Sequence, residues 1–128
     1  MISPLNTFTK GERLRKKQHL DALFQSNESF IEFPFRVVYC KIPTNDISPV
    51  KVLISVPKRR IKKAVDRNLL KRRTREAYRI SKESLCQHIG NIGDTYAIGL
   101  VYVGNEILPY STILKSVAVI IQELKSRL

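Results

Sequence analysis

The side chains with the clearest chemical purpose form a run of cations in the middle of the chain. Residues 58–79 contain 11 lysine and arginine residues and only two acidic ones. Every fourth position of this segment is basic, in a row made of Lys63, Arg67, Lys71, Arg75 and Arg79. Positions four apart lie on one face of an α-helix. Since like charges at this spacing repel by roughly 0.2–0.5 kcal/mol per pair, the row predicts a docking face for an external polyanion.

The start of this helix adds to the same prediction. Lys58 and Arg59 fall where a strand leads into the helix, and exposed N–H groups at a helix N-terminus attract phosphate. Asn68 is the neutral residue among the cations. Its amide could bond a ribose hydroxyl, a base edge or a hydrated metal, and ordering a neighbouring side chain is an equally good hypothesis.

The remaining polar residues do not form a recognisable catalytic group. His19 and His88 are far apart, and neither Cys40 nor Cys86 has the local signature of a nucleophile. The sequence has no zinc-ligand spacing, no glycine-rich phosphate loop and no paired acids within a motif. An enzyme that acts alone is therefore disfavoured, and no catalytic or metal-binding residue is predicted.

Hydrophobic periodicity predicts the elements that position the cations. They are a short helix over 16–26, strands over 35–42, 50–56 and 95–103, a basic helix over 63–88 and a C-terminal helix from Tyr110 or Ser111. An extra short strand is allowed. The inner side of the basic helix, expected to lie on the sheet, comprises Val65, Leu69, Leu70, Ala77 and Ile80. This order predicts an α/β fold, in which a mixed sheet carries packed helices.

Composition sets the class of protein. The chain has 128 residues, a net charge of +12 and 43% hydrophobic residues, which suits one domain over 1–128 with a real core. Residues 1–12 are expected to be a flexible arm. No apolar run approaches the ~20 residues that span a bilayer, no secretory signal is visible, and two distant cysteines fit a reducing cytoplasm.

The basic segment resembles a known signature. The stretch from Lys63 to Arg79 is similar to the motif K-A-V-x-R-N-x-x-K-R-x-x-R-E of the bacterial ribonuclease P protein subunit, and it keeps every lettered position. The strand Leu53–Arg59 and the opening Arg13–Lys16 also resemble that family, so the likeness covers about residues 12–125. The resemblance implies a two-layer α/β sandwich with order α-β-β-(β)-α-β-α. It also implies a left-handed β-α-β crossover, although general topology favours the right-handed one.

The resemblance further implies a function. It predicts an RNA-binding subunit, one copy per catalytic RNA, in an endoribonuclease that removes the 5′ leader of precursor tRNA. In that family the RNA carries the Mg²⁺-dependent hydrolysis, and the protein positions the leader and favours metal binding. The positions that match RNA-facing ones are Lys58, Arg59, Lys63, Arg67, Asn68, Lys71, Arg72, Arg75 and Arg79. Asp66 and Glu76 are expected to orient arginines.

The resemblance also implies a cleft between the first helix and the sheet that binds the single-stranded leader. Its aromatic positions fall on Leu20, Phe24 and Tyr39, where Leu20 departs from the usual Phe. From the residues alone, Phe24 and Tyr39 could equally be core, since Tyr39 shares a strand face with Phe35 and Val37.

Four other interpretations of the basic helix stay open at this stage. A structural RNA-binding protein, such as a ribosomal protein, needs the same cations without any role in cleavage. A DNA-binding protein is less favoured because no second helix precedes the basic one at a short turn. A membrane-surface helix is least favoured, since the sheet needs its apolar side. A solvated helix face or a targeting patch is the plainest explanation, but such faces usually mix both signs of charge.

Overall fold

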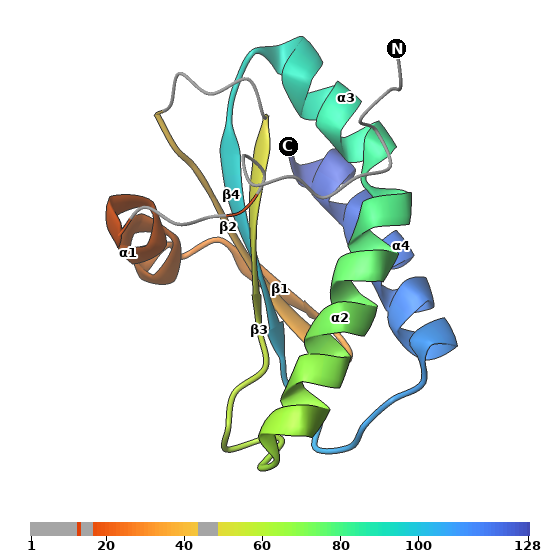
Figure 1. Ribbon diagram of the computed structural model, residues 1–128. Helices are drawn as coiled ribbons and strands as arrows, with labels where there is room; N and C mark the ends of the chain where they lie inside the picture. Colours follow the sequence, from red (N-terminus) through yellow and green to blue (C-terminus); the bar gives the residue numbers. More distant parts are fainter. Residues whose placement is uncertain (1–12, 14–16, 44–48) are drawn as a thin grey trace.

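The computed structural model describes residue 13 and residues 17–43 and 49–128. The elements are α1 (Lys17–Gln25), β1 (Ser29–Glu32), β2 (Phe35–Lys41), β3 (Val50–Ser55), α2 (Ala64–Ser81), α3 (Glu83–Ile92), β4 (Tyr96–Tyr102) and α4 (Tyr110–Arg127). Figure 1 shows the sheet between two unequal helical sides: α2, α3 and α4 lie on one side, and the short α1 lies on the other.

The four strands form one mixed sheet in the order β1-β2-β4-β3. β1 and β2 pair antiparallel, β2 and β4 pair antiparallel, and β3 runs parallel to β4. The chain leaves β3, returns through α2 and α3, and enters β4 beside β3, with the left-handed sense that the resemblance implies (Figure 1). This crossover carries the cationic segment across one face of the sheet, so the predicted fold class is confirmed.

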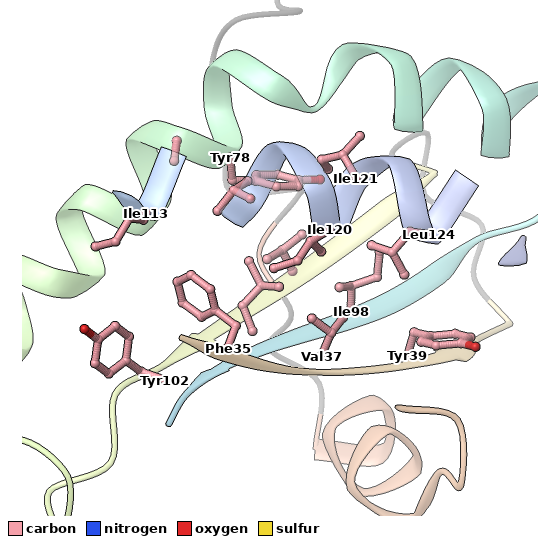
Figure 2. Packing of buried hydrophobic residues seen from close by; sticks show 14 of the residues in the cluster. Phe35, Val37, Tyr39, Tyr78, Ile98, Tyr102, Ile113, Ile120, Ile121 and Leu124 are labelled. Carbon is pink, nitrogen blue, oxygen red and sulfur yellow. The ribbon is translucent and has the colours of Figure 1, made fainter. Parts of the chain in front are cut away.

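The main core fills the space between the sheet and α2, α3 and α4 (Figure 2). Alternate residues of β2 and β4 point into it, because side chains of a strand alternate between the two faces of a sheet. From the helices, Leu70, Leu85 and Ile113 are fully buried in the same cluster. The C-terminal helix contributes Val117, Ile120, Ile121 and Leu124, which are also buried there.

The opposite face of the sheet carries a smaller cluster under α1. Leu23 is fully buried against Val38 and Ala97, and Leu20 packs at the margin of this cluster. The close approach of α1 depends on Gly99. A Cβ built there would lie 2.8 Å from Cγ2 of Val38 and 3.1 Å from Cδ2 of Leu23, distances too short for a side chain. Gly99 therefore makes room for the first helix.

The prediction of one helix over 63–88 is wrong, because the structure divides this segment. α2 ends at Ser81 and α3 begins at Glu83, with Lys82 between them. Hydrophobic periodicity continues through the junction, so the pattern alone does not reveal it. Gly90 lies inside α3, and the helix ends at Gly93, which has a left-handed φ of 84°. The optional extra strand exists as β1, just after α1.

Two expectations remain as they were. The proposed flexible arm over 1–12 lies outside the described residues, and the assignment of 1–128 to a single domain stays a prediction. Within the described ranges, no helix combines the length and apolar character needed to cross a membrane.

Candidate nucleic-acid interface

The inner face of α2 is fixed by four buried residues. Leu70, Thr74, Ala77 and Tyr78 are at most 2% exposed, and the Thr74 hydroxyl donates to the Leu70 carbonyl at 2.8 Å. The predicted inner face is right at Leu70 and Ala77 and wrong at Val65 and Ile80, which are 71% and 43% exposed. Val65 lies in the first turn of α2, and the helix contacts α4 more extensively than β3, so the buried stripe is turned toward α4.

The predicted RNA-facing residues lie away from this buried stripe. Six of them are exposed and three are half-buried. The exposed ones are Lys58, Arg59, Lys63, Asn68, Arg72 and Arg75, and the half-buried ones are Arg67, Lys71 and Arg79. Lys58 and Arg59 lie in the turn between β3 and α2, and Lys63 is the N-cap residue of α2. The set therefore follows one stretch of the chain, from the β3–α2 connection along α2, and we call it the α2 cationic surface.

Six cations of the α2 cationic surface have no ion-pair or side-chain hydrogen-bond partner in the described ranges, and three of the six belong to α2 itself. These three are Lys71, Arg72 and Arg75. Their side chains are long, and a charged head group in water exchanges its solvent for phosphate readily. We call these three residues of α2 the outward cations, because their charges stay available to an external anion.

Arg67 is used differently. Its Nη1 donates to the backbone carbonyls of Ile61 and Lys62, at 3.0 and 2.7 Å. Both carbonyls belong to the connection that precedes α2, so one guanidinium group fixes the turn that carries Lys62 and Lys63. The remaining N–H groups of Arg67 stay available, since a guanidinium has five donors. Arg67 thus positions the basic connection as well as adding charge.

Arg79 pairs with an acid of its own helix. Its Nε donates to Oε2 of Glu76 at 2.9 Å, and Nη2 bonds Oε1 of the same carboxylate. The hydrogen bond from Arg79 lowers the pKa of the Glu76 carboxyl below its ordinary value, and the carboxylate raises the pKa of Arg79. The expectation that Glu76 orients an arginine is therefore met, and part of the charge of Arg79 is neutralised.

Sequence reasoning missed a hollow beside the second half of α2. It is about 650 Å³ in volume and is lined by Arg13, Arg72, Arg73, Arg75, Glu76, Arg79 and Tyr110. Arg73 is fixed in its wall, because its Nη1 donates to the Leu108 carbonyl at 2.6 Å. Tyr110 begins α4 and could not be connected to α2 from spacing alone. The proximity of Arg13 likewise depends on a tertiary contact, its single β-bridge to Val52.

The predicted leader-binding residues do not lie together. Leu20 and Phe24 belong to α1, and Phe24 is 59% exposed. Tyr39 is 5% exposed and belongs to the main core on the opposite face of the sheet. Figure 2 shows Tyr39 on the side of Ile120 and Leu124, with α1 beyond the sheet. The grouping of Tyr39 with Leu20 and Phe24 is therefore wrong, because odd-numbered positions of β2 face α4.

Tyr39 instead takes part in a contact between the first two strands and the C-terminal helix. Its hydroxyl donates to Oε2 of Glu28 at 3.2 Å and accepts from Nη1 of Arg127 at 3.4 Å. The Arg127 guanidinium lies 4.6 Å from the ring centroid of Phe30. The alternative interpretation of Tyr39 as a core residue is thus the one that the structure supports. On β2 the neighbour that faces α1 is Val38.

The chemistry of the other titratable groups is limited. In the part of the chain that the structure describes, no three His, Cys, Asp or Glu side chains come together, so it contains no site where such side chains alone would enclose a metal ion. Burial raises the pKa of the Cys40 thiol, which makes it a poorer nucleophile at neutral pH. What the arrangement offers is therefore a cationic docking surface.

Comparison with known proteins gives one consistent family. The model of the family described as Ribonuclease P matches residues 8–124. Two ribonuclease P protein components from Porphyromonas gingivalis resemble the chain. The one from strain W83 is 31% identical, and the match covers 86% of this chain and 80% of the relative. The one from strain ATCC 33277 is 33% identical, and the match covers 88% of this chain and 83% of the relative.

A solved structure shares the fold. The RNase P protein of Staphylococcus aureus superposes with a TM-score of 0.68 at 20% identity, covering 88% of this chain and 94% of the other. At this identity the superposition supports the architecture, and the family model and the Porphyromonas relatives support the membership. The chain therefore belongs to the ribonuclease P protein family.

Proposed function

We propose that this chain is the protein subunit of a ribonuclease P that binds the catalytic RNA through the α2 cationic surface. The observation that carries the proposal is the set of outward cations: Lys71, Arg72 and Arg75 project from one helix and have no partner in the described parts of the chain. A folded RNA presents phosphates along its backbone, and each neutralised phosphate releases counterions that favour association. Family membership supports the identity of the RNA.

The proposal gives each cation a part in that surface. The outward cations contact phosphate directly, and Arg72 and Arg75 can do so with two parallel hydrogen bonds. Lys58, Arg59 and Lys63 extend the surface to the start of α2, where Arg67 fixes the backbone of the connection. Asn68 is exposed among them and supplies a neutral donor and acceptor for a ribose hydroxyl or a base edge.

The reaction assisted by this binding is the endonucleolytic removal of the 5′ leader of precursor tRNA. We assign the Mg²⁺ ions of that hydrolysis to phosphates of the RNA, and no catalytic step to a side chain of this protein. The cationic surface helps by lowering the repulsion among the RNA phosphates that must gather around the metal. Its effect is therefore greatest where Mg²⁺ is scarce.

The leader is proposed to pass along the α1 side of the sheet. Phe24 is the exposed ring there, and Leu20 lies one helical turn before it. Stacking of a base on an aromatic ring contributes roughly 1–3 kcal/mol, so Phe24 is the stronger contact and Leu20 the weaker. Tyr39 has no part in this contact, since it is buried on the opposite face.

We further propose one copy of the protein for each RNA, acting in the cytoplasm. One cationic surface along α2 and the connection before it suits one docking site on the RNA, and α1 lies on the far side of the sheet, where the leader is proposed to bind (Figure 1).

The function is tested by adding the purified protein to ribonuclease P RNA and measuring precursor-tRNA cleavage across a range of Mg²⁺ concentrations. The expected result is a large gain in turnover at low Mg²⁺ and little gain at high Mg²⁺. An unchanged profile, together with tight binding to an unrelated structured RNA, would favour a structural RNA-binding protein with no role in cleavage.

The leader contact has a matched control in the chain. Phe24 and Phe33 are 59% and 60% exposed, but Phe33 lies in the turn between β1 and β2. Phe24→Leu should weaken the binding of precursor tRNA and leave the binding of mature tRNA unchanged, whereas Phe33→Leu should change neither. Equal losses for both substrates with Phe24→Leu would mean that this ring only supports the fold.

A further inference from the structure

The arginines that line the hollow beside α2 have different surroundings. Two of its arginines are held by the protein: Arg73 donates to the Leu108 carbonyl, and Arg79 is paired with Glu76. Arg72 and Arg75 line the same hollow and are exposed, with no partner in the described residues. Five arginines and one glutamate leave this small volume strongly positive. A site so charged attracts an anion, and its planar guanidinium groups favour phosphate with bidentate geometry.

The hollow also contains one aromatic ring. Tyr110 is half-buried, packs at the edge of the main core and lines the hollow at the start of α4. Arg79 lines the same hollow as Tyr110. A ring supported from behind by the core loses little conformational entropy when a flat partner stacks on it. The hollow therefore offers a phosphate site and a stacking site side by side.

From these features we infer that the hollow captures one unpaired nucleotide of the RNA partner. The phosphate binds Arg72 and Arg75, and the base lies against Tyr110 and the guanidinium plane of Arg79. Proteins recognise single-stranded RNA by stacking bases on aromatic side chains and on Arg guanidinium planes. The volume of about 650 Å³ lies within the range of small-ligand sites, so a single nucleotide fits it. This inference rests on the proposed function, because it names the feature of the RNA that the α2 cationic surface holds.

The test uses the full-length protein and the 5′-monophosphate of 2-aminopurine riboside, whose fluorescence falls when its base stacks on an aromatic ring. Titration with the protein should give saturable quenching. Tyr110→Phe should keep the quenching, and Tyr110→Leu should abolish it. Arg72→Gln/Arg75→Gln should weaken binding roughly tenfold, because two charge-assisted contacts are lost. The matched charge control is Lys115→Gln/Lys125→Gln on α4, which does not line the hollow and should bind the probe normally.

Three results would overturn the inference. The first is the absence of saturable quenching at millimolar protein. The second is equal binding of the nucleoside that lacks the phosphate. The third is competition by inorganic phosphate with no dependence on residue 110, which would make the hollow a simple anion site. Thermal unfolding of each variant confirms that it is folded. Binding of the wild-type protein to ribonuclease P RNA is measured in parallel. If RNA binds and the nucleotide does not, only the inference fails; if the RNA does not bind, the proposed function fails first.

Discussion

Two sets of arginine and lysine residues on α2 have the same charge and opposite surroundings. One set, the tethered arginines, is bound by the protein itself and consists of Arg67, Arg73 and Arg79. The other set, the outward cations, has no partner in the described residues and consists of Lys71, Arg72 and Arg75. A row of cations at helical spacing therefore serves two purposes at once. Some of its members fix neighbouring loops, and the others stay free for an external anion.

The largest effect on RNA binding should come from the outward set. Arg72→Gln/Arg75→Gln should weaken binding to ribonuclease P RNA by about tenfold or more, since two contacts to phosphate are removed. The free energy of unfolding should not fall, because no intramolecular hydrogen bond of the described chain is lost and the repulsion of Arg75 by Lys71 and Arg79 is removed. The measurement is a binding titration at fixed salt, accompanied by denaturant unfolding.

The matched control for this prediction is Lys115→Gln/Lys125→Gln, which lowers the net charge equally at exposed and half-buried positions of α4. It should lose far less affinity. An equal loss in both double variants would mean that net charge, and not this surface, determines binding.

The next largest effect should be a loss of stability when the tethered Arg73 is replaced. Arg73→Gln removes a 2.6 Å hydrogen bond from a half-buried guanidinium to the Leu108 carbonyl. We expect the free energy of unfolding to fall by about 1–2 kcal/mol, since a half-buried carbonyl is left without its charged donor. RNA affinity should fall less than in the double variant of the outward cations. A variant as stable as the wild type with tenfold weaker RNA binding would place Arg73 in the outward set.

A smaller loss of stability is expected when Arg67, at the start of α2, is replaced. Arg67→Lys keeps the positive charge but cannot reproduce the two bonds from Nη1 to the carbonyls of Ile61 and Lys62. We expect a loss of about 1 kcal/mol in unfolding free energy and only a slight loss of RNA affinity. Strong loss of RNA affinity with normal stability would show that the guanidinium of Arg67 itself contacts RNA.

The smallest effect should follow from releasing a tethered arginine. Glu76→Gln removes the carboxylate that pairs with Arg79, so RNA affinity should rise by about twofold, in keeping with an exposed ion pair. Because Arg79 lowers the pKa of Glu76, the pair stabilises the fold above the ordinary pKa of the acid, and this contribution is lost as pH falls through the lowered value. The stability difference between wild type and variant should therefore vanish in acid. A difference that persists at low pH would contradict this assignment.

The sequence predicts the position of the outward cations because helical spacing is a local property. Lys71, Arg72 and Arg75 face away from the buried stripe wherever a helix covers this segment, and the motif supplied the helix. The tethers were not predictable in this way. Arg73 is 35 residues from its acceptor Leu108, and only the packing of α2 on α4 brings the two together. For the same reason spacing did not indicate the hollow that includes Tyr110.

On the α1 side of the sheet, the local pattern did not determine which strand residues the first helix contacts. Strand alternation correctly predicted that Phe35, Val37 and Tyr39 lie on the same face of β2. The alternation does not say which face the first helix covers. That choice depends on tertiary packing, such as the close approach that Gly99 allows. The resemblance placed Tyr39 on the α1 side of the sheet, and the structure places Val38 there instead, packed with Leu23.

The most direct test of the account is the salt dependence of binding to ribonuclease P RNA for the wild type and the two double variants. For Arg72→Gln/Arg75→Gln we expect a slope of log affinity against log salt that is shallower by about two units. Each lost phosphate contact reduces the magnitude of this slope by about one. Lys115→Gln/Lys125→Gln should keep the wild-type slope. The same slope in all three proteins would contradict the claim that the outward cations of α2 dock the RNA.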